Sequence, residues 1–243
     1  MYMKNMKVIA LSLSVLIVFA GCGSMSNAEK NGLIGAGAGV ALGALAGRLI
    51  GGGATGTVIG AAIGTAVGTT AGALIGKKMD KAKAAAEAAA AAAKVEEVTD
   101  KNGLPAVKLT FESGILFQTG SSALSPNAQQ SLISFANNVM KQNADMDCAI
   151  QGYTDNTGWR GSTAEQSQQK NKDLSLQRAQ AVSTFLVNQG VSASQIKTVE
   201  GLGELYPVAD NSTDAGKTQN RRVELYLYAS ESMIKAANAG TLQ

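Results

Sequence analysis

Residues 152–158, GYTDNTG, place the carboxylate of Asp155 in a short polar turn directly after an apolar stretch. A carboxylate there can hydrogen-bond its own backbone and so merely shape the turn. It can also accept a cationic group of a ligand. Arg178, in the helical segment LSLQRA, offers the complementary group, since a planar guanidinium can bind a carboxylate through two parallel hydrogen bonds. A helix arginine is also commonly solvated, so the residue types alone leave binding and purely structural roles open.

The composition excludes several classes of chemistry. The 243 residues include no histidine, which removes imidazole as a metal ligand and as a base near neutral pH. No GxSxG motif occurs, and the segment GALIGKK lacks the first glycine and the Ser/Thr of a phosphate-binding loop. The net charge of +3 is too small to indicate nucleic acid. We therefore expect no enzymatic activity, no cofactor, no metal and no nucleic-acid partner.

The N-terminal residues have the features of an export signal. Two lysines precede an uncharged apolar stretch at 8–20, which is too short for an ordinary membrane span. The following FAGC resembles the lipobox of bacterial lipoproteins. That resemblance implies a signal peptide at 1–21, lipidation of Cys22 and a lipidated tether at 22–31. The alternative is an uncleaved signal anchor.

Glycines recur every four residues over a long N-terminal segment, with one step of five between two runs. They are Gly35, Gly39, Gly43, Gly47 and Gly51, then Gly56, Gly60, Gly64, Gly68, Gly72 and Gly76. This period places each run on one side of a helix. Each glycine costs roughly 1 kcal/mol relative to alanine in a helix, and close helix–helix packing can offset that cost. We predict a glycine-zipper hairpin over 32–78, with helices at 33–50 and 55–76. Membrane insertion and association with other copies both remain open.

The segment after the zipper is rich in alanine, the strongest helix former. Because it shows no apolar stripe against a polar one, it predicts a free-standing helical linker at 79–100. The globular part is then expected at 101–230, followed by a C-terminal tail at 231–243.

The globular part has the alternating patterns of a mixed α+β domain. AVKLTF, DMDCAIQGY, KTVEGLG and RVELYLYA predict strands, because apolar and polar residues alternate in them. SPNAQQSLISFANNVMKQN and DLSLQRAQAVSTFLVNQG predict helices, the first with Ser125 as its N-cap. The predicted order is βαβαββ, with two helices on one face of a mixed sheet.

Five motifs in this part carry a family resemblance. ILFQTGSSAL, IQGYTDNTG, NKDLSLQRAQAV, VEGLGELYPVADN and NRRVELYL stand in the order found in OmpA-like C-terminal domains. The resemblance covers residues 104–229. Together with the lipobox and the glycine zipper, the chain resembles an OmpA-family outer-membrane lipoprotein of the YiaD type.

The resemblance implies non-covalent binding of peptidoglycan through the diaminopimelate of its stem peptide. Asp155 would accept the ammonium of that residue and Arg178 would bind its carboxylate. Weaker candidates by the same resemblance are Thr119, Gly120, Asn171 and Arg222. The interval between Asp155 and Arg178 is longer than is common in the family. Its extra residues, within 158–170, have no apolar pattern and are expected to form a loop.

Two functions of different classes remain. The favoured one is a lipid-anchored protein that tethers the outer membrane to peptidoglycan, with its C-terminal domain in the periplasm. The alternative is a membrane-active oligomer or pore built by the glycine zipper and positioned by the wall-binding domain. Trp159, in the expected loop, would either contact sugar or stem peptide or simply pin the loop to the domain.

Overall fold

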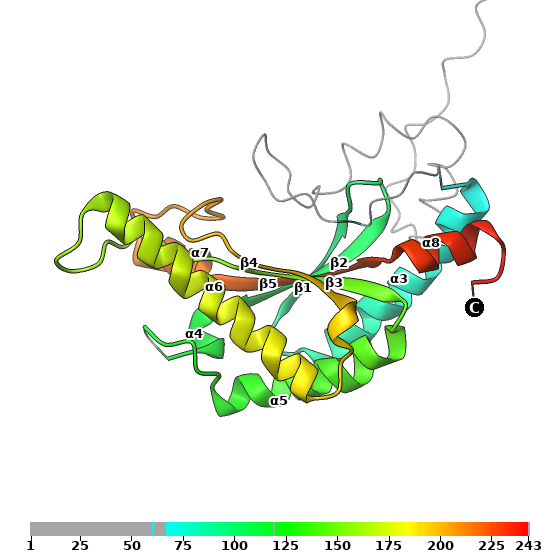
Figure 1. Cartoon of the computed structure of the whole chain (residues 1–243), viewed down its shortest axis with the longest axis horizontal. Coiled ribbons are helices and arrows are strands. Elements are labelled where there is room, and N and C mark those ends of the chain that lie inside the picture. Colours follow the sequence, from blue (N-terminus) through cyan, green and yellow to red (C-terminus); the bar gives the residue numbers. More distant parts are fainter. Residues whose placement is uncertain (1–59, 61–66, 119, 243) are drawn as a thin grey trace, which may run out of the picture.

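The described part of the chain forms one five-stranded sheet (Figure 1). The computed structural model describes residues 60, 67–118 and 120–242. The strands are β1 (Lys94–Thr99), β2 (Pro105–Glu112), β3 (Met146–Gly152), β4 (Ile196–Gly201) and β5 (Arg222–Ala229). They lie in the order β1-β2-β5-β3-β4, with β3 and β4 parallel and the other neighbouring pairs antiparallel.

The adjacent strands β2 and β5 carry much of the core on alternate residues. On β2 and β5 the large apolar side chains that are fully buried are Val107, Leu109, Phe111, Val223, Leu225 and Leu227. Leu109 pairs directly with Leu225 in the antiparallel register. Since successive side chains of a strand point to opposite faces, this alternation turns one face of the sheet toward the helices.

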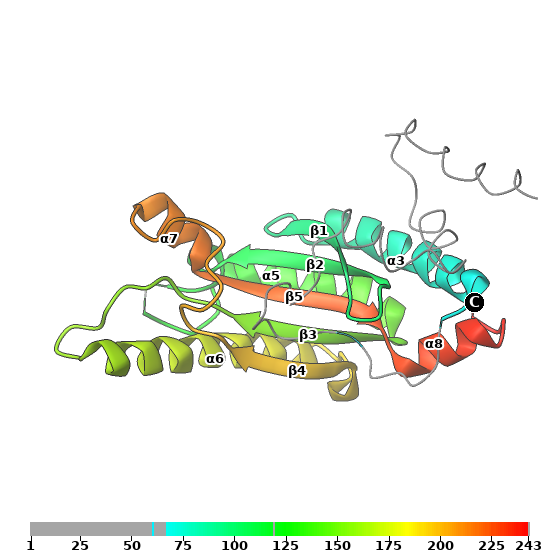
Figure 2. The same cartoon turned by 90° about the horizontal axis from the view of Figure 1, so that it is seen from above.

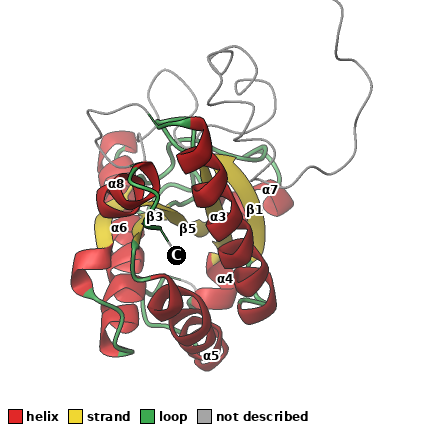
Figure 3. Ribbon diagram, turned by 90° about the vertical axis from the view of Figure 1, so that its right-hand side faces the viewer, coloured by secondary structure: helices red, strands yellow, loops and turns green. Residues whose placement is uncertain are grey.

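Two long helices cover that face, as the sequence predicts. The first, α5 (Pro126–Phe135), begins at Ser125, whose Oγ accepts the Ala128 backbone N–H. It continues through a π-helical turn (Ala136–Met140) and a 3-10 turn (Lys141–Asn143). The second is α6 (Ala164–Asn188). Both contribute buried apolar residues to the core that contains Leu109 and Leu225, and Figure 3 views this layer end-on. The predicted α+β class and the βαβαββ order are confirmed.

Close approach between α6 and the sheet depends on two glycines. A Cβ on Gly152 of β3 would lie 2.1 Å from the carbonyl oxygen of Ser175, and one on Gly201 of β4 would lie 2.3 Å from the Leu176 nitrogen. No side chain fits at such distances, so these glycines let the helix lie directly on the two strands. The contact is at Ser175 and Leu176, less than one turn before Arg178.

A further helix in this layer was expected to stand free of the domain. It is α3 (Thr69–Ala89), whose Ile75, Met79, Ala82 and Ala86 are fully buried on one helix face. The expectation of a linker at 79–100 is therefore corrected: α3 ends at Ala89 and residues 94–99 form the edge strand β1. Alanine is apolar on every face of a helix, so the sequence shows no stripe, yet its small side chains allow close packing.

The C-terminal segment was also expected to be a tail. It contains α8 (Glu231–Asn238), capped by Ser230, whose Oγ accepts the Met233 backbone N–H. Met233, Ile234 and Ala237 are buried against the same core as α3. Figure 2 places α3 and α8 together at one end of the sheet, with α7 (Asp214–Asn220) and the start of α6 at the other. The remaining short elements are α4 (Ser113–Leu116) and a 3-10 turn (Ala193–Gln195).

The predicted second zipper helix at 55–76 agrees with the structure only from Thr69 onward, where α3 begins, and differs at Gly60 and Gly68. Gly60 has a φ of +138° and lies in a bend, and a Cβ there would lie 2.9 Å from Asp100 Oδ2. Gly68 is the N-cap of α3 and donates its backbone N–H to Asn238 Oδ1 at 3.3 Å. Gly72 lies inside α3. Outside the described residues lie Cys22, Gly35, Gly39, Gly43, Gly47, Gly56 and Gly64. Among the helices that can be described, none has both the length and the apolar character to cross a membrane.

Candidate functional site

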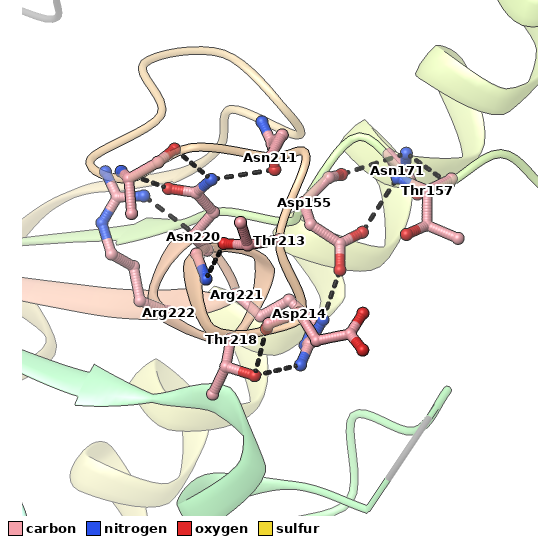
Figure 4. A network of polar contacts seen from close by, with 12 residues as sticks. Asp155, Thr157, Asn171, Asn211, Thr213, Asp214, Thr218, Asn220, Arg221 and Arg222 are labelled. Carbon is pink, nitrogen blue, oxygen red and sulfur yellow. Dashed lines mark hydrogen bonds and ion pairs between the residues drawn. The ribbon is translucent and has the colours of Figure 1, made fainter.

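Asp155 lies just beyond the end of β3, in a largely buried position with 6% of its surface exposed. Its Oδ1 accepts the backbone N–H of Thr157 at 2.9 Å. Its Oδ2 accepts a hydrogen bond from Nη1 of Arg221, and the two side chains form an ion pair (Figure 4). Asp155 therefore both shapes its turn and carries a charge that a guanidinium already recognises.

The ionisation of Asp155 is protected by its partners. Burial raises the pKa of this carboxyl, but the Thr157 hydrogen bonds and the Arg221 guanidinium outweigh burial and hold the pKa below its ordinary value. The carboxylate is thus charged at neutral pH and able to accept a cationic group.

Arg178 projects from α6 toward the same region. It is 4% exposed, its Nε donates to the carbonyl oxygen of Ser121 at 3.1 Å, and its guanidinium lies 5.3 Å from the Phe117 ring centre. Burial lowers the pKa of Arg178, the positive charge of Arg221 lowers it further, and the negative charge of Asp155 opposes both. Arg178, Arg221 and Asp155 are therefore close enough to interact electrostatically. With the described residues, the terminal nitrogens of Arg178 form no hydrogen bond.

Arg221 belongs with Arg222 to the NRRVELYL motif of the family resemblance and was not among the predicted ligand-binding residues, yet it is the arginine that lies beside Asp155. Its Nη2 donates to Thr218 Oγ1 at 2.8 Å, which holds the half-exposed guanidinium beside Asp155. The two adjacent arginines at residues 221–222 of the NRRVELYL motif were the sequence signal for this position. Adjacent residues at a strand start turn to opposite sides, so only one of the two arginines could face the Asp155 turn.

Arg222, which was expected near the ligand, is instead held in a buried network on the other side of the strand (Figure 4). Its Nε donates to Glu224 Oε1 at 2.8 Å. Nη1 donates to the Asn220 carbonyl and Nη2 to the Tyr206 carbonyl. The guanidinium also lies 3.7 Å from the Tyr153 ring centre. Every nitrogen of Arg222 thus has a partner, which indicates a structural role.

The loop that carries the two weaker candidates lies against Arg178. Thr119 is outside the described residues. Gly120 is exposed, with a φ of +69°, and directly precedes Ser121, whose carbonyl accepts Arg178 Nε. This loop therefore forms one side of the guanidinium's surroundings.

Asn171 connects α6 to the Asp155 turn. Its Nδ2 donates to the Thr157 carbonyl at 3.2 Å and to Glu204 Oε2 at 3.3 Å, and lies 3.5 Å from the Asp155 carbonyl. Its Oδ1 accepts the indole N–H of Trp159 at 2.7 Å. Glu204 was not a candidate in the sequence analysis, because nothing in its segment indicated that it would reach α6.

The expected loop at 158–170 is helical from Ala164 onward. Thr163 and Gln166 form a capping box: the Thr163 side chain accepts the Gln166 backbone N–H, and the Gln166 side chain accepts the Thr163 backbone N–H. These turns have no apolar stripe because their residues are mostly exposed, beyond the part of α6 that covers the sheet. Trp159 donates its backbone N–H to Ser167 Oγ at 3.0 Å, which ties the short remaining loop to this helix.

A hollow of about 430 Å³ lies against the face of the sheet opposite α5 and α6. Its lining includes Lys108, Arg222 and Glu224 but neither Asp155 nor Arg178. The buried charges pair with neighbours, Arg222 with Glu224 and Lys108 with Glu96. Because these charges are already compensated, the hollow offers a weaker binding site than the Asp155 cluster. The part of the chain that can be searched holds no group of three or more potential metal ligands.

Two protein families match this chain. The OmpA family matches residues 116–221, and the YMGG-like Gly-zipper family matches residues 3–80. The resemblances to OmpA-like domains and to glycine-zipper segments are thereby confirmed, and the lipobox stays a prediction. The first match contains Asp155, Arg178 and Arg221.

Individual relatives align with about half of the chain. The chain is 40% identical over 119 residues to the probable lipoprotein YiaD of Escherichia coli K12, which covers 49% of this chain and 50% of YiaD. It is 39% identical over 120 residues to the peptidoglycan-binding protein ArfA of Mycobacterium tuberculosis H37Rv, covering 49% of this chain and 34% of ArfA. The chain therefore spans half or less of these relatives' length.

A solved structure shares the fold. The crystal structure of a MotB-like protein from Desulfovibrio vulgaris superposes with a TM-score of 0.52 at 21% identity, covering 63% of this chain and 92% of that one.

Proposed function

We propose that this protein, which carries an OmpA-family domain at residues 116–221, binds peptidoglycan non-covalently through Asp155, Arg178 and Arg221. The observation that carries the proposal is the charge cluster itself: the buried carboxylate of Asp155 is ion-paired with Arg221, and the buried guanidinium of Arg178 lies close enough to interact electrostatically with both. A relative, ArfA, is named as peptidoglycan-binding.

The cluster suits the free end of diaminopimelate, where an ammonium and a carboxylate share one carbon. The ligand carboxylate would lie between Arg178 and Arg221, whose like charges repel each other in the free protein. An anion between them relieves that repulsion and can be bound by two parallel hydrogen bonds. The ligand ammonium would then meet Asp155, whose oxygens have lone pairs beyond those used by Thr157 and Arg221.

The proposal extends to the whole chain as a membrane-to-wall anchor. Lipidation of Cys22 would place the N-terminus in the outer membrane, and the OmpA-family domain would grip the wall in the periplasm. YiaD, named a probable lipoprotein, supports this assignment. The signal peptide proposed at 1–21 fits the same scheme, with the wall-binding domain extended beyond 101–230 to include α3, β1 and α8. We further propose a binding protein and not an enzyme.

Sedimentation with purified, diaminopimelate-containing sacculi tests the proposal. The variants are Asp155→Asn, which keeps the shape but removes the charge, and Arg178→Ala. Each should weaken retention of the full-length protein by at least about tenfold, since each removes a charged hydrogen-bonding group. Asp210→Asn is the matched control, an exposed aspartate on a nearby loop. Retention of both site variants at the wild-type level would overturn the proposal.

The zipper alternative, a membrane-active oligomer or pore, rests on the YMGG-like match at 3–80. It stays a prediction that dye release from liposomes can test with the full-length protein. Release that persists in Asp155→Asn would show a membrane activity independent of wall binding.

A further inference from the structure

Trp159, the only tryptophan of the chain, lies on the short loop between β3 and α6. Two hydrogen bonds tie Trp159 to α6. Its backbone N–H donates to Ser167 Oγ, and its indole N–H donates to Asn171 Oδ1. At 38% exposure, the ring covers this part of the helix while one portion faces solvent.

The indole bond determines the orientation of the Asn171 amide. An asparagine side chain can be turned so that its oxygen and nitrogen exchange places. The indole N–H is a donor only, so the position facing it must be occupied by Oδ1, at 2.7 Å. The amide nitrogen is then directed to the other side, where carbonyl and carboxylate oxygens surround it.

The directed nitrogen holds the turn that presents Asp155. Asn171 Nδ2 donates to the carbonyl oxygen of Thr157. The backbone N–H of Thr157 in turn donates to Asp155 Oδ1. Without the indole, the amide of Asn171 could rotate and set its oxygen against the Thr157 carbonyl. The turn would then lose a fixed point next to the carboxylate.

We infer that Trp159 is a positioning residue of the peptidoglycan site, acting through Asn171 on the turn at 155–157. The inference rests on the proposed function. The longer interval between Asp155 and Arg178 therefore organises the site instead of closing it: the capping box starts the added helical turns, and these turns hold the tryptophan and Ser167 in place.

The test compares affinities of the full-length protein for meso-diaminopimelate by calorimetry. Trp159→Phe keeps an aromatic ring but removes the N–H donor. We expect its affinity to fall about two- to tenfold, the range for one hydrogen bond. Benzothienylalanine at position 159 preserves the ring shape and removes only the N–H, so it should show the same loss. Melting temperatures of both proteins should stay near the wild-type value, which separates a local effect from unfolding.

A double-mutant cycle shows whether the effect passes through Asn171. In an Asn171→Ala background, Trp159→Phe should cause no further loss of affinity, because the amide it orients is gone. Additive losses would overturn the inference. Direct stacking on the ligand would also overturn it, and would appear as full affinity in both donor-less proteins with loss only in Trp159→Ala.

The inference can fail separately from the proposed function. If the wild-type protein binds diaminopimelate and Asp155→Asn does not, the site is established. Unchanged affinity of the benzothienylalanine protein then contradicts only the role of Trp159. If the wild-type protein does not bind at all, the proposed function fails first. Arg160→Ala, an exposed neighbour in the same loop, is the matched control and should bind like wild type.

Discussion

The adjacent residues Arg221 and Arg222 lie in two different environments, one partly exposed to solvent and the other buried. Arg221 reaches the carboxylate of Asp155 with a side chain that is 39% exposed. Arg222 is 3% exposed and lies within a closed network with Glu224, two carbonyls and the Tyr153 ring. The two sides share residue types, so composition does not distinguish them.

The difference lies in how fully the charges are satisfied. On the Arg222 side, Glu224 also accepts the hydroxyl of Tyr226, so both carboxylate oxygens are used. On the Arg221 side, Asp155 is paired with Arg221, while the nearby Arg178 forms no ion pair among the described residues, which leaves one positive charge in excess. Saturated networks stabilise a fold, whereas an uncompensated charge beside solvent can be completed by a ligand.

The largest expected effect is a loss of stability when the Arg222 network is broken. Arg222→Ala leaves the Glu224 charge buried without its partner, which should lower the free energy of unfolding by about 3–5 kcal/mol. Arg221→Ala removes a half-exposed group and leaves the buried Asp155 carboxylate with its Thr157 hydrogen bond, so it should cost less, about 1–2 kcal/mol. Urea unfolding of the two variants measures both values. Equal losses would mean that the two arginines do not differ as described.

The next effect concerns the packing that brings Arg178 to the site. Gly152→Ala forces a Cβ against the Ser175 carbonyl and should destabilise the fold by about 1–3 kcal/mol through overpacking. Because the shift displaces α6, affinity for sacculi should fall as well. Gly114→Ala is the matched control, since a Cβ there meets nothing within 4 Å. Wild-type retention by Gly152→Ala would show that α6 tolerates displacement.

The pH dependence of binding tests whether the charged carboxylate of Asp155 is required for binding. The pKa of Asp155 is held below its ordinary value, so the carboxylate stays charged as the pH falls from 7 to roughly 5, one unit above an ordinary aspartate. Affinity should therefore be flat over this interval and decrease only as the pH falls through the depressed pKa. Calorimetry in matched buffers measures this profile. A midpoint near pH 6 would indicate that another group controls binding.

The smallest expected effect lies in the first turns of α6. Thr163→Ala removes the capping side chain and should cost about 1 kcal/mol locally. Hydrogen exchange at 164–170 should accelerate, while exchange in the strands stays unchanged. Protection equal to wild type would mean that Gln166 and Trp159 alone hold this end.

Much of the fold followed from local patterns. The alternation of Val107, Leu109 and Phe111 predicted β2, and Ser125 with Pro126 predicted the start of α5. The helical turns after Thr163 were overlooked, although Thr163 and Gln166 have the spacing of a capping box. Their lack of an apolar stripe suggested a loop, because exposed turns need no buried face.

The remaining differences depend on tertiary contacts that no local pattern contains. Alanines occur on every side of α3, so the sequence does not indicate which side is buried. The packing of Ile75 and Met79 determines the buried face. In the same way, the choice between Arg221 and Arg222 depended on where β5 begins. Asp155 and Arg178 were identified through the family resemblance, and Trp159 was singled out with two possible roles. The pairing of Arg221 with Asp155 and the hydrogen bond from Trp159 to Asn171 required the geometry.

The central claim is that an ionised carboxylate and two guanidiniums receive an amino-acid group of the wall. Calorimetry of the full-length protein with meso-diaminopimelate and with pimelate, which lacks both ammonium groups, tests it most directly. The account predicts binding of diaminopimelate, at least about tenfold weaker binding of pimelate, and loss of that difference in Asp155→Asn. Equal affinity of the wild-type protein for the two ligands, or no binding of either, would contradict it.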